Sequence, residues 1–96
     1  MEKHYRSKSV MLATLAKVQP LQAEILKTGR SCHLDAGVYQ NLMWERDETH
    51  LNFELTVFED HDIVKEFDFY SDMTEKELQA EFGCLEAYVE RIKEEA

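Results

Sequence analysis

The clearest alternation of apolar and polar residues in the chain lies between His50 and Phe58. Every second residue inside this segment is apolar, namely Leu51, Phe53, Leu55 and Val57. A period of two is typical of a strand that buries one face. A second run, Ile63 to Tyr70, places Ile63, Phe67 and Phe69 on one face. We therefore expect the two runs to pair as an antiparallel hairpin.

The four polar residues between these runs, 59–62, are typical of a turn. If all four formed the loop, Phe67 and Phe69 would face away from the core, because a shift of one residue exchanges the two faces of a strand. A loop with an odd number of residues keeps both apolar sets together. We therefore expect a β-bulge in this turn.

A shorter apolar run, Val38 to Glu45, allows two interpretations. A helix capped by Asp35 would gather its apolar side chains on one side, whereas a strand would alternate them. As a strand, followed by a four-residue turn at 46–49, the run pairs Leu42 with Phe53 and extends the same core face. The strand is therefore the favoured prediction.

Helical spacing marks both ends of the chain. From Ser9 to Thr28 apolar residues recur every three or four positions, and Gly29 follows as a C-terminal cap. Pro20 interrupts this pattern, so we expect either a kink or two short helices. The last helix begins at Thr74 and Glu77, which have the spacing of a capping box. Its apolar stripe is Leu78, Phe82, Leu85, Val89 and Ile92.

The predicted fold is a two-layer α+β domain, in which both helices cover one face of a three-stranded antiparallel meander. A length of 96 residues suits one domain, with residues 1–8 as a basic, flexible arm. Gly83 lies inside the last helix, where glycine is less favourable than alanine by about 1 kcal/mol. We take it to indicate a close approach by another element.

Two cysteines are too few for a disulfide framework and indicate reduced thiols in a cytoplasmic protein. Basic residues precede the apolar run Val10–Ala16, as in a signal peptide. However, Lys17 ends that run and the helical pattern continues beyond it, so we expect no signal. No apolar stretch approaches the length of a membrane span.

Charge is divided unevenly along the chain. Residues 1–46 hold seven Lys and Arg against four Asp and Glu, a balance of 7 − 4 = +3. Residues 47–96 hold four against sixteen, a balance of 4 − 16 = −12. A segment this acidic repels nucleic acid and anionic lipid and favours a basic partner.

The order helix, three strands, helix also occurs in the double-stranded RNA-binding domain, to which the predicted topology is similar. That family docks through basic residues around its second helix. The corresponding helix here carries five carboxylates at Glu75, Glu77, Glu81, Glu86 and Glu90. This sign of charge opposes contacts with phosphates, so we claim no membership of that family and expect no direct binding of nucleic acid.

The face of the predicted sheet opposite the helices gathers carboxylates. Either bulged register places Glu54 opposite another carboxylate, Asp68 or Glu66, and like charges that face each other across strands are destabilising. Phe58 and Tyr70 share this face, and aromatic residues among charges are typical of a binding surface. A solvated face that only keeps a small domain soluble is the simpler interpretation.

The first hypothesis is a non-enzymatic protein whose acidic surface occupies a basic, nucleic-acid-binding site on a partner protein. Inhibitors that imitate nucleic acid, and immunity proteins that plug a nuclease, work in this way. The residues predicted to bind the partner lie on the open sheet face or along the last helix: Glu45, Glu54, Glu66, Asp68, Phe58, Tyr70, Glu77, Glu81, Glu86 and Glu90.

Two alternatives remain. In a self-associating structural or adaptor domain, the N-terminal arm with its basic residues would lie on the acidic face of a second copy, giving a homodimer. A small metal-dependent regulator or enzyme would use Cys32, His33, His61 and Cys84. The spacing of these residues matches no zinc or calcium motif, so we assign no catalytic residue, cofactor or metal ligand.

Overall fold

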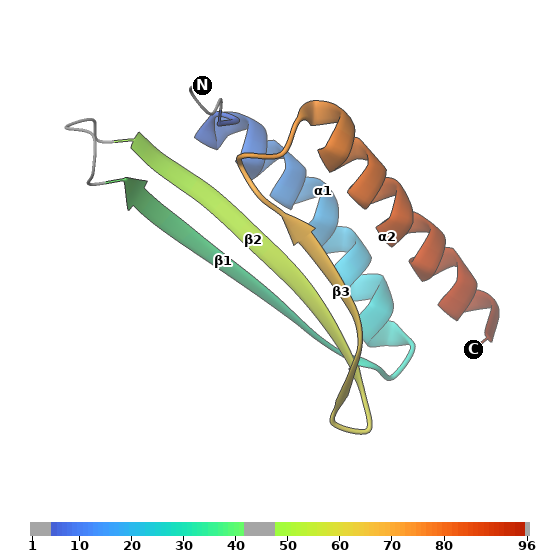
Figure 1. Cartoon of the computed structure of the whole chain (residues 1–96). Coiled ribbons are helices and arrows are strands. Elements are labelled where there is room, and N and C mark those ends of the chain that lie inside the picture. The colour runs from blue at the N-terminus through green and yellow to red at the C-terminus, as the bar shows by residue number, and fades with distance from the viewer. Residues whose placement is uncertain (1–4, 42–47, 96) are drawn as a thin grey trace.

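The computed structural model describes residues 5–41 and 48–95 of the chain. The elements, in order, are α1 (Lys8–Lys27), β1 (Ser31–Asn41), β2 (Glu48–Glu59), β3 (Asp62–Phe69) and α2 (Glu75–Glu95). The strands form an antiparallel sheet in the order β1-β2-β3, and both helices cover one of its faces (Figure 1). The predicted two-layer α+β architecture is therefore confirmed.

Helix α1 begins directly after Ser7, whose Oγ accepts a hydrogen bond from Val10 N at 3.2 Å. It ends before Gly29, whose φ of 91° lies in the left-handed region that suits glycine. Pro20 lies inside one helix of 20 residues, so the alternative of two short helices is wrong. The line of α1 that faces the core consists of Met11, Val18 and Ile25.

Strand β1 is longer than the sequence pattern indicates. It begins at Ser31 rather than Val38, and Ala36 lies opposite Phe53. The predicted pairing of Leu42 with Phe53 is therefore wrong, and so is the helical alternative for the first part of this segment. The small and polar side chains of residues 31–37 favour strands only weakly. A continuous ladder to β2 holds them in place.

The hairpin of β2 and β3 closes through a two-residue turn. Asp60 and His61 have φ angles of 49° and 72°, as a type I′ turn requires. The predicted bulge is present, but it lies within β3 and not in the turn. Ile63 and Lys65 pair with consecutive residues of β2, which leaves Val64 as the extra residue.

This bulge decides which side chains of β3 reach the core. Beyond it, Phe67 and Phe69 are buried opposite apolar residues of β2, as predicted. Before it, Ile63 lies opposite Phe58 on the open side of the sheet and is 61% exposed. The prediction that Ile63 shares the core face of Phe67 is therefore wrong, because the extra residue exchanges the two faces.

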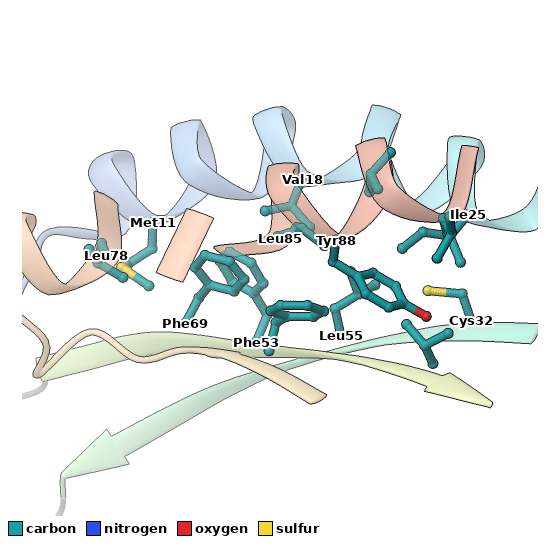
Figure 2. Close-up of a cluster of buried hydrophobic side chains, with 14 of the residues drawn as sticks. Met11, Val18, Ile25, Cys32, Phe53, Leu55, Phe69, Leu78, Leu85 and Tyr88 are labelled. Carbon is teal, nitrogen blue, oxygen red and sulfur yellow. The ribbon is translucent and has the colours of Figure 1, made fainter. Parts of the chain in front are cut away.

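Helix α2 begins with the predicted capping box. Thr74 N donates to Glu77 Oε1 and Glu77 N donates to Thr74 Oγ1, both at 3.1 Å. Phe82 is half-buried, and the remainder of the predicted stripe is buried together with Tyr88. Figure 2 shows Leu78, Leu85 and Tyr88 of this helix between the helices and the sheet. Phe53 and Phe69 stack there with ring centroids 4.9 Å apart.

Arg30, in the loop between α1 and β1, contacts the ends of two elements, β2 and α2. Its Nε lies 2.6 Å from Glu59 Oε1 at the end of β2, and its Nη2 lies 3.4 Å from Glu95 Oε2 at the end of α2. The Arg30 side chain is only 18% exposed, so this pair of contacts is partly shielded from solvent. Lys93 of α2 and Glu24 of α1 join the two helices at 3.7 Å.

Gly83 provides a test of helix packing. It is exposed, and a Cβ placed on it would meet no atom within 4 Å, so the predicted close approach is wrong. Replacing Gly83 by Ala should therefore raise the free energy of unfolding by about 0.5 to 1 kcal/mol, measured by urea denaturation. Gly29→Ala is the contrasting control and should destabilise the protein, because φ at Gly29 is 91°. A destabilised Gly83→Ala variant would contradict the exposed position.

Candidate partner-binding site

The centre of the open sheet face carries three carboxylates, Glu54, Glu66 and Asp68, which we call the acidic cluster. One oxygen from each side chain lies within 4.8 Å of the other two. Glu54 lies directly opposite Asp68 in the ladder of β2 and β3, which is one of the two predicted registers. Glu66 is two residues before Asp68 and therefore points to the same face.

The backbone explains why these side chains are so close. Asp68 N donates to Glu81 Oε2 of α2 at 3.0 Å, so this amide points away from β2. Glu54 and Asp68 therefore form a non-hydrogen-bonded pair, in which the two Cα atoms are only about 4.5 Å apart. The pairing of the strands, rather than the flexibility of long side chains, holds the carboxylates together.

Tyr70 follows β3 and adds a hydroxyl to the acidic cluster. Its hydroxyl donates a hydrogen bond to Glu54 Oε1. This bond above all, then burial and the charges of Asp68, Glu54 and Glu66, raise the pKa of Tyr70 far above its ordinary value. The phenol therefore keeps its proton and remains a donor. Tyr70 and Glu54 border a shallow cavity of about 180 Å³ that also touches residues 35–37 of β1.

The charge of the cluster is not neutralised within the described part of the chain. No ion pair among the described side chains includes Glu54, Glu66 or Asp68. Burial raises the pKa of Asp68, and the charges of Glu66, Glu54 and Glu81 raise it further, while the Tyr70 hydroxyl acts in the opposite direction. Burial and the neighbouring carboxylates therefore both disfavour the charged form of Asp68.

The four predicted helix carboxylates have different environments. Glu77 belongs to the capping box and Glu81 bonds the edge of β3, so both have a structural role. Glu86 is exposed, and Glu90 Oε1 lies 3.6 Å from Lys93 Nζ on the same helix. Of these four, Glu81 is the one that the structure brings to the acidic cluster. Glu45 lies outside the described residues.

Phe58 occupies a different part of the open face. It lies four residues from Glu54, or about 13 Å along β2. Its ring contacts His33 edge-on with centroids 5.3 Å apart, beside a shallow cavity of about 370 Å³. Ile63 and Val64, which are 61% and 43% exposed, come from the same end of the hairpin. The open face therefore has an acidic centre and an apolar end.

Ile63 is a surface residue that the sequence interpretation missed. The apolar pattern did indicate a bulge in this hairpin, but the expected position of the bulge was the turn. A bulge at Val64 alone transfers Ile63 to the open face beside Phe58.

The thiols and imidazoles of the metal hypothesis do not meet at one place. Cys32 is buried on the core face of β1, where burial raises the pKa of its thiol to about 11. His33, the next residue, is exposed on the other face and shares a cavity with His61. Cys84 is exposed on α2. A thiol protonated at neutral pH is a poor ligand and nucleophile.

Oxygen ligands such as those of the acidic cluster suit a hard cation. Exposed acidic groups of this kind are common without an ion, so the cluster alone assigns no metal.

Comparison of the chain with protein families, with curated proteins and with solved structures found no match. None of the helices in the described residues has the length and apolar character needed to cross a bilayer. The functional proposal therefore rests on the surface of the molecule itself.

Asp68→Asn tests the repulsion within the acidic cluster. This variant should raise the free energy of unfolding at pH 7 by about 0.5 to 1 kcal/mol, the scale of a cross-strand charge pair. The pKa of Asp68 in the folded protein is raised above 3.8, so the folded state binds this proton more tightly than the unfolded state. As pH rises through the window from 3.8 to the raised pKa, the wild-type chain loses stability relative to the variant.

The advantage of Asp68→Asn should therefore be complete above that window and absent below pH 3.8. Urea denaturation across this range measures it. Glu86→Gln removes an exposed carboxylate from α2 and should show no comparable gain. A variant that is no more stable than wild type at pH 7 would disprove the repulsion.

The two thiols should react very differently in the native protein. A colorimetric disulfide reagent should modify Cys84 quickly and leave Cys32 unmodified, because Cys32 is buried and its pKa is about 11. In denaturant both thiols should react. Rapid native modification of two thiols per chain, or a fast reaction that survives Cys84→Ser, would place Cys32 at the surface instead.

Proposed function

We propose that this protein is a non-enzymatic binding protein whose open sheet face occupies a basic site on a partner protein. The observation that carries this proposal is the acidic cluster of Glu54, Glu66 and Asp68, with three carboxylate oxygens within 4.8 Å. The nature of the charge points to a partner site that normally holds nucleic-acid phosphates, because both ligands are anionic.

A cationic partner removes the repulsion that the free protein carries. Burial raises the pKa of Asp68 most, and this repulsion by Glu66, Glu54 and Glu81 raises it further. A guanidinium placed over the cluster donates charge-assisted hydrogen bonds to the carboxylates of Glu54 and Asp68, and such bonds are stronger than neutral ones. Binding then converts an unfavourable interaction within the sheet into a favourable contact between two proteins.

At the apolar end of the same face, a bound partner would remove apolar side chains from water. Phe58, Ile63 and Val64 come from one end of the hairpin, and the latter two are substantially exposed. Binding energy concentrates in buried apolar and aromatic anchors, whereas charges set the association rate and the choice of partner. The combination of an acidic centre and an apolar end favours a binding surface over a face that serves solubility alone.

Tyr70 is held ready beside the charges. Its hydrogen bond to Glu54 fixes the hydroxyl, so less side-chain freedom is lost when a partner covers the ring. It therefore remains a proposed anchor at the acidic centre, and Ile63 joins Phe58 at the apolar end.

Charge reversal tests this function. The tagged protein is used to capture partners from a lysate of its source, with washes at low and high salt and identification by mass spectrometry. The expected partner is a basic protein that is captured stoichiometrically and released by high salt. Adding excess duplex DNA should also displace it, because the proposed surface and nucleic acid compete for one site.

The double variant Glu54→Lys with Asp68→Lys should lose this capture. Its matched control is Glu75→Lys with Glu94→Lys, which changes the net charge equally at exposed positions of α2 outside the predicted binding residues and should retain it. Circular dichroism must show that both double variants are folded. Undiminished capture by the Glu54 and Asp68 variant would overturn the proposed site.

A further inference from the structure

Strand β1 is an edge of the sheet, and the middle of this edge is uncovered by the described residues. It runs for 11 residues, Ser31–Asn41, and contains no proline and no lysine. Its pairing with β2 is continuous, without a bulge. Long, regular edges of this kind offer a template for another strand, and natural proteins usually interrupt them with those devices.

The direction of the free backbone groups follows from two hydrogen bonds. Because Asp68 N points away from β2, the backbone of Glu54 must point toward β1, where it faces Asp35. The backbone N–H and C=O groups of Asp35 and of the other odd-numbered residues of β1 therefore bond β2. The backbone groups of the even-numbered residues point away from the sheet. Gln22 agrees with this, since its Nε2 donates to the carbonyl of Cys32 at 3.3 Å.

The outward groups near the middle of β1 are those of Leu34 and Ala36. Neither residue has a hydrogen-bond partner from the described part of the chain on this side. The other edge of the sheet differs, because Glu81 binds Asp68 N and the bulge at Val64 interrupts β3. Within the described residues, Glu81 and the bulge therefore interrupt the β3 edge, whereas the middle of the β1 edge stays open.

An exposed stripe on α1 borders the open edge. Leu12 and Leu26 are 48% and 49% exposed, although leucine is usually buried. At about 100° per residue, both fall on the flank of α1 that includes Gln22, which reaches β1. Glu24, which pairs with α2, lies on the opposite flank. The exposed residues between the two leucines on this stripe are Ala16, Gln19 and Ala23.

We propose that a second copy of this chain pairs with β1, so that two sheets join into one antiparallel sheet of six strands. Identical strands pair antiparallel about a two-fold axis, and the axis that uses the whole of β1 passes through its central residue, Ala36. This register makes about ten backbone hydrogen bonds. It places Asp35 opposite Gly37 of the second copy, which avoids two like charges face to face.

The distribution of charge favours this side of the molecule for contact with a second copy. Residues 1–46, which include α1 and β1, have a net charge of +3, whereas residues 47–96 carry −12. Contact through α1 and β1 therefore keeps the strongly acidic parts of the two copies apart. The axis is perpendicular to the sheet, so all four helices lie on one face and both acidic clusters lie on the other. This dimer depends neither on the proposed partner nor on the N-terminal arm.

The oligomeric state tests the proposal. Light scattering after size-exclusion chromatography should show a wild-type dimer that dissociates on dilution. Ala36→Lys should be monomeric, because it places two cations at the axis. Ala87→Lys makes the same change at an exposed position of α2 and should remain dimeric. Both variants must melt cooperatively by circular dichroism.

A crosslink gives a positive readout of the register. Residues opposite each other in a hydrogen-bonded pair have Cα atoms about 5.5 Å apart, a separation that a disulfide spans. In a Cys84→Ser background, Ala36→Cys should form a covalent dimer on mild oxidation, whereas Ala87→Cys should not. A wild-type chain that stays monomeric at every concentration overturns the proposal, and so does a dimer that survives Ala36→Lys without forming the crosslink.

Discussion

The central strand β2 fixes the position of everything else in this fold. It pairs with β1 on one side and β3 on the other, so its alternation decides which residues of all three strands face the helices. Leu51, Phe53, Leu55 and Val57 are all buried. A strand that buries every second residue cannot slip by one position without exposing this entire set, so the opposite face and its carboxylates are specified by the same pattern.

The elements that could be predicted from the sequence are those whose own residues define them. Helix α2 has both a capping box and an unbroken stripe, and β2 has strict alternation, so each was recognisable alone. The first half of β1 was not, because Asp35, Ala36 and Gly37 have little preference for a strand and become one only through the ladder to β2. The wrong prediction that Leu42 pairs with Phe53 has the same cause.

The part of the candidate site that could be predicted is the part that depends only on which face of the sheet each residue occupies. Glu54 and Asp68 both lie on the open face, as expected, but the sequence left open whether Asp68 or Glu66 lies opposite Glu54. The bulge at Val64 decides for Asp68. The role of Glu81 was not predictable, because its hydrogen bond to Asp68 N depends on where α2 lies against the edge of β3. Ile63 shows the same limit, since a single extra residue moved it from the core side to the surface.

Arg30 has a consequence for how the protein unfolds. Its two carboxylate partners, Glu59 and Glu95, are far from it along the chain and come from different elements, so both contacts require the complete fold. Fraying of the last turn of α2 removes the contact of Glu95 with Arg30 and so loosens the side chain that binds Glu59. Fraying of the end of β2 loosens Arg30 in the same way for Glu95. Arg30 therefore couples opening of the terminal turn of α2 to opening of the hairpin end of β2, although helix ends usually open independently.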